Sequence, residues 1–368
     1  MDKFDFLNLI ATIAVFVSLL FAFFLLTVKT KNKLANRLFA IFLLLNALDT
    51  SGFLNYSFIN LDYFRLSFYL LSMPIFYLYV ISLCYNDFQL KPKHLLHTIP
   101  FVVFNLVLTP RLYLANDADK KYFFEHLQQM PEIYFSHIIG ELQYAFYIIA
   151  IFLTLKKYKE IYLENYANPN TSLYKWLLQI MVCFLIAHSI VITRDLLRYS
   201  DYNEIFIGIN VIIGIGVLFI TCWFVLKALN NPELFRGIDS KLQLVKDILP
   251  ESENNLIIQT HIALLKKYME EEEPFLEPSL TIQELATQIK MPVRDLSILI
   301  NHHMNLHFFD FVNEYRIKKA MKILSDPSKK NLTVLEILYE VGFNSKSSFN
   351  TSFKKYTNLT PTAFRSQS

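Results

Sequence analysis

Apolar runs dominate the first part of the chain. Between Phe6 and about residue 230, uncharged apolar stretches recur roughly every 25 to 35 residues, each long enough to cross a hydrocarbon layer of about 30 Å as a helix of about 20 residues. The pattern predicts seven membrane-spanning helices, at about residues 6–28, 38–58, 66–86, 94–113, 133–155, 175–193 and 205–227. This region is therefore expected to be a polytopic helix bundle.

Two of these spans depart from a plain apolar pattern. The second contains Asp49, and the fourth is short and contains Pro100. The first span, Phe6 to Val28, is too long for the core of a signal peptide and lacks a small-residue cleavage pattern, so it is expected in the mature protein. Seven crossings place the two ends of the chain on opposite sides of the membrane, whereas six would place them on the same side.

The charged loops predict the orientation. The loops after spans one, three and five contain ten cations against three acids: Lys29, Lys31, Lys33, Arg37, Lys91, Lys93, Lys156, Lys157, Lys159 and Lys175 against Asp87, Glu160 and Glu164. Cationic loops stay in the cytoplasm, so the N-terminus is expected outside and the region after residue 230 inside. The predicted location is the inner (cytoplasmic) membrane of a bacterium.

The region after residue 230 has the pattern of a soluble helical protein. Pro232, Gly237 and Pro250 interrupt residues 230–256, which are interpreted as a linker. Thr281 and Glu284 then form a predicted capping box that opens a short helix, and Pro292 begins a second helix after a tight turn. This spacing is typical of a helix-turn-helix unit.

The same pattern occurs a second time. Thr333 and Glu336 predict another capping box, Gly342 supplies the turn, and a polar helix begins near Ser345. A long helix that ends near Asp326-Pro327 lies between the two units. We therefore expect two helix-turn-helix units that share one linker helix.

Many fixed spacings in residues 257–368 resemble the AraC/XylS-type DNA-binding domain, over about a third of the chain. They are Leu280-Thr281, Glu284-Leu285-Ala286, Leu296-Ser297, Tyr315-Arg316-Ile317, Gly342-Phe343-Asn344-Ser345, Ser348-Phe349-Asn350, Phe353-Lys354-Lys355, Thr360-Pro361 and Phe364-Arg365. The resemblance implies a seven-helix module whose two recognition helices enter successive major-groove segments of DNA. Residues 280–368 contain twelve cations against seven acids, which suits a polyanionic partner.

The resemblance also implies which residues contact DNA. In the second unit they are Lys346, Ser347, Asn350 and Thr351, followed by Lys354 and Lys355; in the first unit they are Arg294, Ser297 and Ile298. Each of these positions has an alternative interpretation as a solvated helix face. Leu338 stands where the pattern usually has a small Ala, and Ile298 stands at a position that is often polar, so specificity is expected to rest more on the second unit.

Polar groups inside the predicted spans are the candidates for sensing, because ionisable residues in lipid are costly. They are Asp49, His137, Glu141 and His188. His137 and Glu141 are four residues apart on one helical face, where the carboxylate would favour a protonated imidazole. The alternative interpretation is interhelical hydrogen bonding that only holds the bundle together, and it is slightly favoured.

Composition and the remaining motifs narrow the class of protein. Of 368 residues, 54% are apolar and 18% are charged, which does not describe an ordinary soluble protein. Cys84, Cys183 and Cys222 lie in or beside apolar runs, so neither a disulfide framework nor a metal site is predicted. The sequence has no phosphate-binding glycine loop, catalytic triad or HExxH motif, so we expect no enzyme and no cofactor.

These patterns predict an all-α protein with a seven-helix transmembrane sensor domain (1–229), a linker (230–256) and a DNA-binding domain (257–368). The predicted function is that of a membrane-bound one-component transcription regulator. A transporter or other integral membrane protein with a regulatory or partner-binding tail is the alternative, and a scaffold that concentrates DNA at the membrane is the third. The predicted partners are double-stranded DNA, the lipid bilayer, a small-molecule or membrane-derived signal, and a second copy of the chain in a homodimer.

Overall fold

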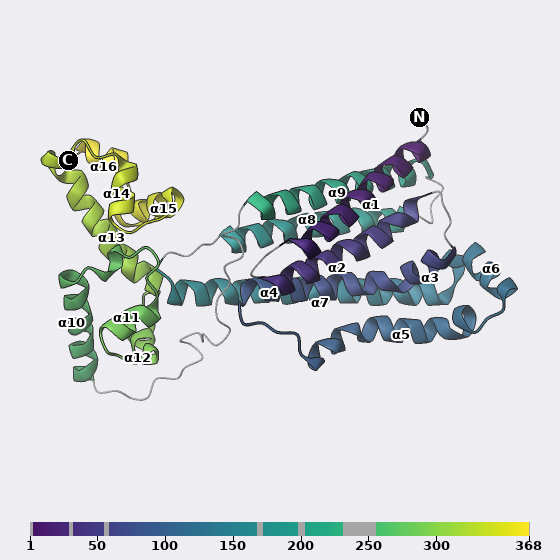
Figure 1. Ribbon diagram of the computed structural model, residues 1–368, viewed down its shortest axis with the longest axis horizontal. Coiled ribbons are helices and arrows are strands. Elements are labelled where there is room, and N and C mark those ends of the chain that lie inside the picture. Colours follow the sequence, from purple (N-terminus) through teal and green to yellow (C-terminus); the bar gives the residue numbers. More distant parts are fainter. Residues whose placement is uncertain are drawn as a thin grey trace. The chain divides into compact units, whose positions relative to one another are not determined.

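The computed structural model describes residues 3–28, 32–54, 59–167, 172–197, 203–230 and 255–367 (Figure 1). These residues are almost entirely helical, and they include an isolated antiparallel bridge between Tyr166 and Thr281. The chain divides into two compact units. The first unit is Met1–Lys156 with Ser172–Ser240, and the second unit is Lys157–Thr171 with Lys241–Ser368. The all-α class predicted from the sequence is confirmed within the described residues.

The first unit contains seven helical segments that are long and apolar enough to cross a membrane, which agrees with the predicted number. Their outer surfaces are apolar, with Phe16 64%, Phe23 67% and Leu142 67% exposed in the absence of lipid. The helices are α1 (Lys3–Thr27), α2 (Lys33–Thr50), α3 (Ile59–Phe68), α4 (Ser72–Cys84), α5 (Ile99–Leu108), α6 (Asp117–Glu125), α7 (Pro131–Asn165), α8 (Ser172–Leu197) and α9 (Asn203–Asn230).

Several of these segments are built from more than one helix. A 3-10 turn, Tyr69–Leu71, joins α3 and α4 into the span Asp62–Cys84. The fourth span, Pro92–Tyr113, consists of a 3-10 segment, α5 and a π turn, with Pro100 in the first turn of α5. Proline is tolerated there because the first N–H groups of a helix have no intrahelical partner.

Aromatic side chains fill the space between α2, α4, α8 and α9. The ring of Phe39 lies 4.2 Å from that of Phe224 and 4.9 Å from that of Tyr79, between centroids. The Trp176 ring lies 4.8 Å from that of Phe224. Many of the aromatic residues in the spans therefore hold helices together.

One helix crosses the boundary between the units. With 35 residues, α7 is longer than the roughly 20 residues that a span requires, and its last residues, from Lys157, belong to the second unit. The sequence-based division into residues 1–229 and 257–368 instead places the end of α7 with the membrane helices. Residues 231–254, the main part of the predicted linker, lie outside the described residues.

The second unit has seven helices in its described residues besides the end of α7. They are α10 (Asn255–Glu271), α11 (Ile282–Gln288), α12 (Val293–Ile298), α13 (Phe308–Ser325), α14 (Val334–Glu340), α15 (Lys346–Thr357) and α16 (Pro361–Gln367). The long helix α13 connects two apolar clusters: Phe308 and Phe311 pack with α10–α12, and Ile317 and Leu324 pack with α14–α16. Two helix-turn-helix units on one linker helix are thus present, as the spacing predicts.

Both predicted capping boxes form. The backbone N–H of Glu284 donates to the Thr281 hydroxyl at 3.2 Å, and the Thr281 N–H donates to the Glu284 carboxylate at 2.8 Å. Thr333 and Glu336 form the same pair of bonds at 3.1 and 2.6 Å. The Thr333 backbone N–H and hydroxyl both donate to the Glu336 carboxylate, and these two bonds hold the pKa of Glu336 below its usual range. Each box satisfies N–H groups that the first helical turn leaves without partners.

Candidate nucleic-acid interface and sensing cluster

Helix α15 presents one polar face to solvent. Its exposed residues are Lys346, Ser347, Asn350, Thr351, Lys354 and Lys355. Their spacing places them on one side of the helix, and Phe349, Ser352 and Phe353 are buried on the other side. Every residue of the second helix-turn-helix that the sequence predicts to contact DNA therefore lies on the accessible face of α15. The contact itself stays a prediction.

The ends of α15 are fixed by local structure. The hydroxyl of Ser345 accepts the backbone N–H of Ser348 at 3.4 Å, and Asn358 ends the helix in the left-handed conformation with φ 59°. Gly342 in the preceding turn has φ 89°, and a Cβ there would lie 2.6 Å from the carbonyl oxygen of Phe275. The turn thus requires glycine for its conformation and for the close approach of another backbone.

The lysines of this face differ in their partners. The Lys355 ammonium donates to the Asp310 carboxylate at 2.6 Å, and the Tyr356 hydroxyl donates to the Asp310 carbonyl at 2.8 Å. Among the described residues, Lys346 and Lys354 form no ion pair. Lys355 therefore has an internal partner to give up before it can pair with a phosphate, whereas Lys346 and Lys354 do not.

The first recognition helix is less accessible than the sequence predicts. Arg294 is exposed, but only 7% of Ser297 and 8% of Ile298 remain accessible, so two of the three residues that the sequence predicts to contact DNA from this helix are buried. The side-chain amide of Asn301 folds back and donates to the Ser297 carbonyl at 3.0 Å and to its hydroxyl at 3.2 Å. Burial runs without a break from Leu296 to Ile300, where α12 passes into a π turn.

In the first unit, three side chains form a polar cluster between α7 and α8. The Glu141 carboxylate lies 2.8 Å from His188 Nε2, and the His188 ring stacks on Tyr144 with 3.6 Å between centroids. The Tyr144 hydroxyl donates to the Phe184 carbonyl at 2.8 Å. The structure thus brings together two of the predicted sensing residues from different helices, and it adds Tyr144, which the sequence analysis did not single out.

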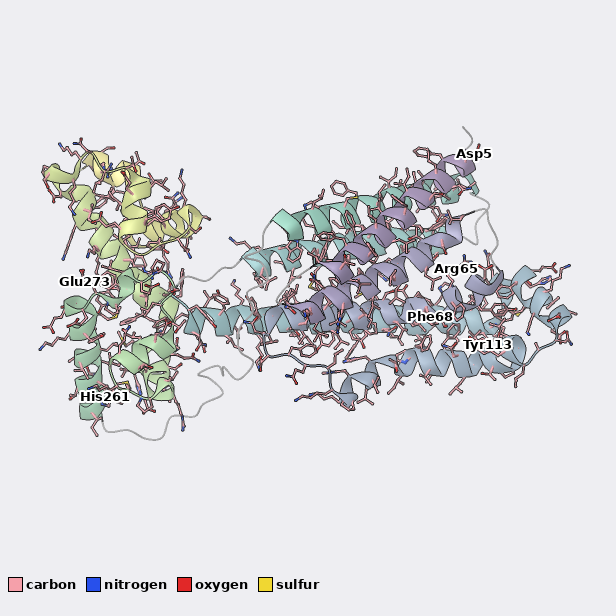
Figure 2. All side chains as sticks on the ribbon, in the orientation of Figure 1. Asp5, Arg65, Phe68, Tyr113, His261 and Glu273 are labelled. Atoms are coloured by element: carbon pink, nitrogen blue, oxygen red, sulfur yellow. The ribbon has the colours of Figure 1, made fainter. Side chains whose placement is uncertain are left out.

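The other predicted sensing residues lie elsewhere in the same unit. His137 is half-buried one turn before Glu141 on α7. Asp49, near the end of α2, is within electrostatic reach of Arg194 and Arg65. Arg65 (labelled in Figure 2) pairs with Asp62 at 3.1 Å, and Arg194 pairs with Asp195 at 2.7 Å.

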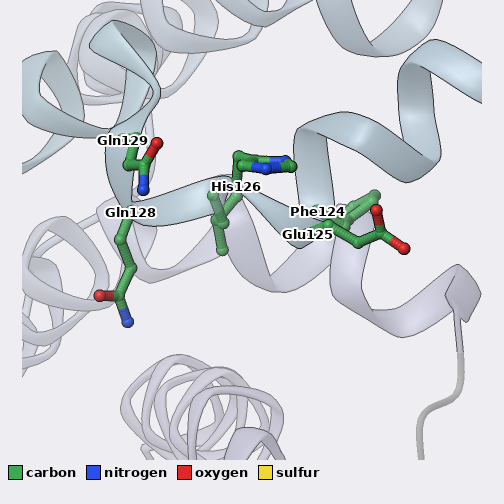
Figure 3. A pocket seen from close by; sticks show the side chains of 6 residues that line it. Phe124, Glu125, His126, Gln128 and Gln129 are labelled. Carbon is green, nitrogen blue, oxygen red and sulfur yellow. The ribbon is translucent and has the colours of Figure 1, made fainter.

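The described residues offer little else that resembles a binding site. A hollow of about 330 Å³ is lined by Phe124 to Gln129, where α6 ends (Figure 3), but all of its lining comes from one continuous stretch of chain. Within the described part of the chain, no group of three or more His, Cys, Asp or Glu residues could hold a metal ion. The hollow therefore does not bring groups from separate elements together, as a binding site usually does.

Comparison with known proteins places the C-terminal region. Residues 285–367 match the helix-turn-helix domain family. This region carries an AraC-type helix-turn-helix domain. The matching family consists of DNA-binding regulators and is not enzymatic, which agrees with the sequence-based expectation.

Two relatives and one solved structure are similar to a part of the chain. The melibiose operon regulatory protein of Escherichia coli (strain K12) is 28% identical over 89 residues, which are 24% of this chain and 28% of that protein. An HTH-type transcriptional regulator from the cgkA 5′ region of Pseudoalteromonas carrageenovora is 50% identical over 52 residues, 14% of this chain and 28% of that protein.

The solved structure is the C-terminal domain of the two-component response regulator yesN from Fusobacterium nucleatum subsp. nucleatum. It has 27% sequence identity and a TM-score of 0.25, and the match covers 29% of this chain and 98% of that one. The chain spans 28% of the length of the two matching relatives. The similarity therefore concerns the DNA-binding domain, and the role of the whole chain is a proposal.

Proposed function

We propose that the protein is a membrane-embedded one-component transcription regulator. In this proposal the seven apolar helices cross the inner membrane and respond to a signal, and the C-terminal domain binds promoter DNA in the cytoplasm. The observation that carries the proposal is the joining of seven apolar helices and an AraC-type domain with an exposed cationic face on α15, in one chain. The DNA would contribute phosphates to the lysines and base edges to Asn350 and Thr351.

The orientation follows from the positive-inside rule. A reporter that is active only in the cytoplasm is expected to be active when fused after Asn231 and silent when fused within residues 115–130. The opposite pattern would refute the seven-span topology.

Sequence-specific DNA binding is tested with the intact chain in lipid nanodiscs. The protein is expected to enrich specific duplexes from a random pool of DNA. Its affinity should fall steeply as salt rises, because cationic side chains displace counterions from the phosphates. Enrichment of no sequence, or affinity that does not depend on salt, would contradict the proposal.

For the signal, the polar cluster on α7 and α8 is the proposed site of response. A signal changes output only through unequal affinity for two states of the bundle, and a polar contact between two helices, such as Glu141 with His188, has different energies in such states. Glu141→Gln is expected to change transcription from a target promoter without changing protein abundance. Glu125→Gln, the same change at an exposed position of α6, is the control and should leave transcription unchanged.

A lower abundance of the Glu141→Gln protein with unaltered output per molecule would identify the cluster as structural. The same measurement on His137→Ala tests the pair that the sequence favours. An effect of His137→Ala without an effect of Glu141→Gln would move the proposed site to the sequence-predicted pair.

A further inference from the structure

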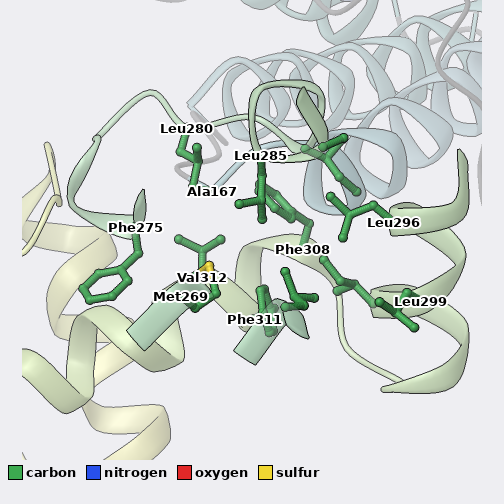
Figure 4. Close-up of a cluster of buried hydrophobic side chains, with 14 of the residues drawn as sticks. Ala167, Met269, Phe275, Leu280, Leu285, Leu296, Leu299, Phe308, Phe311 and Val312 are labelled. Carbon is green, nitrogen blue, oxygen red and sulfur yellow. The ribbon is translucent and has the colours of Figure 1, made fainter. Parts of the chain in front are cut away.

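The cytoplasmic end of α7 is built into the second unit. Ala167 follows the last turn of the helix and is completely buried in the apolar cluster of the first helix-turn-helix, among residues that include Leu280 and Leu285 (Figure 4). Its backbone N–H donates to the Leu280 carbonyl at 3.1 Å, and Tyr166 forms the antiparallel bridge with Thr281. Thr281 is the N-cap of α11, so the contact is made where the first helix-turn-helix begins.

A buried guanidinium makes the second half of this contact. Arg316 on α13 is inaccessible to solvent, and burial lowers its pKa to about 9, which leaves it charged at neutral pH. It donates to the carbonyls of Phe275 at 2.6 Å, Glu277 at 2.7 Å and Ala167 at 3.3 Å. A buried charge needs a full set of hydrogen-bond partners, and Ala167 supplies one of them.

The same guanidinium reaches the second helix-turn-helix. The Arg316 guanidinium lies over the ring of Phe343, 5.5 Å from the centroid. It also donates to the Phe275 carbonyl, and the oxygen of this carbonyl lies close to Gly342. Gly342 and Phe343 form the turn that leads into α15. A continuous path of direct contacts therefore runs from Ala167 through Arg316 and Phe275 to the turn before the proposed recognition helix.

We propose that residues 157–167 are a docking segment through which α7 acts on the DNA-binding domain. Docked, the segment completes the acceptors of Arg316 and holds the turn at Gly342 in the form that binds DNA. Released, it leaves buried donors without partners, and the two helix-turn-helix units lose their fixed arrangement. The proposal rests on the proposed function, and it assigns the coupling to this contact instead of to the 230–256 linker.

Locking the contact is the first test. Tyr166→Cys/Thr281→Cys is made in a chain whose Cys84, Cys183 and Cys222 are replaced by alanine. Residues paired in an antiparallel bridge have Cα atoms close enough for a disulfide. Oxidation of the intact protein in native membranes is expected to cross-link the pair, and Tyr166→Cys alone is the control that cannot cross-link.

Breaking the contact is the second test. Ala167→Glu places a carboxylate in the apolar cluster and should release the segment. In nanodiscs, the full-length variant is expected to bind the duplex enriched by the wild-type chain about fivefold or more weakly. Lys156→Glu introduces the same side chain at an exposed position of α7 just before the docking segment and should leave the affinity within about twofold of wild type.

The outcomes separate this inference from the proposed function. Failure of the pair to cross-link, equal DNA affinity of Ala167→Glu and wild type, or loss of DNA binding on oxidation of the cysteine pair would each overturn the docking proposal. If Ala167→Glu does not fold, the DNA affinities of the oxidised and reduced cysteine pair are compared instead. The oxidised protein is locked in the docked form and must keep its DNA affinity. A wild-type chain that binds no duplex would refute the proposed function, whatever the cross-linking shows.

Discussion

The two helix-turn-helix units begin alike and end differently. Each opens with a Thr–Glu capping box, and each turn closes with the same backbone bond, Met291 N–H to Ala286 O and Phe343 N–H to Leu338 O, both 2.9 Å. After the turn, α15 continues for 12 residues with an exposed polar face, whereas α12 has 6 residues and a buried end. The shared part builds the fold, and the difference leads us to propose that base recognition rests mainly on α15.

The turns should respond most strongly to substitution. Gly342→Ala places a Cβ against the carbonyls of Phe275 and Leu276, at a φ that disfavours alanine. The free energy of unfolding of the second helix-turn-helix should therefore fall by about 3 kcal/mol. The first turn has Lys290 in the left-handed conformation, with φ 55°, and Lys290→Gly should change stability by less than about 1 kcal/mol. Pulse proteolysis in urea measures both, and equal effects would contradict the close approach at Gly342.

Core volume is the next difference. Ala286 and Leu338 occupy equivalent places, and both are almost completely buried. Leu338→Ala should leave a cavity and cost about 2–4 kcal/mol, and Ala286→Leu should overfill its site and cost about 1–3 kcal/mol. Urea unfolding of the two variants checks this. Stabilisation by Leu338→Ala would mean that Leu338, which stands where the family pattern usually has alanine, strains the second helix-turn-helix.

Base discrimination should differ between the recognition helices. Asn350→Ala is expected to reduce discrimination at one base pair by about 1–3 kcal/mol. In the first helix-turn-helix, Ser297→Ala should change discrimination by less than about 0.5 kcal/mol, because Ser297 is buried and its hydroxyl accepts a hydrogen bond from Asn301. Competition binding with single-base variants of the enriched duplex measures both. A larger effect at Ser297 would reverse the roles assigned to the two helices.

The smallest expected effect separates two neighbouring lysines. Lys354→Ala should reduce the slope of log affinity against log salt by about one and weaken binding to all sequences alike. Lys355→Ala should reduce the slope by less, because the Lys355 ammonium is already paired with Asp310. Titrations at several salt concentrations provide the slopes, and a larger change for Lys355 would show that this ion pair opens on DNA.

Local patterns in the sequence predict the elements well. The capping boxes at Thr281 and Thr333, the glycine turn at Gly342 and the exposed face of α15 all depend on residues within one or two helical turns of each other. The seven apolar segments are equally local, since length and hydropathy define them. The burial of Ser297 and Ile298 was not predicted, because it depends on Asn301 and on the π turn that follows α12.

Contacts between residues far apart in the chain have no local sequence pattern that predicts them. Glu141 meets His188 across 47 positions, and Arg316 meets Ala167 across 149. The sequence therefore named both members of the first pair as candidates without pairing them, and it assigned Arg316 only to a family motif. The end of α7 was interpreted as a loop between spans because its apolar run ends at about residue 155.

We propose that one chain holds both a membrane bundle and a DNA-reading helix, and a map of the chromosomal sites bound by the intact protein is the decisive test. The map is made for the wild-type chain and for Lys346→Ala/Asn350→Ala, at equal abundance in the membrane fraction. Discrete sites for the wild type that disappear in the variant are the expected result. No discrete sites, or the same sites in both proteins, would show that the protein does not read DNA through α15.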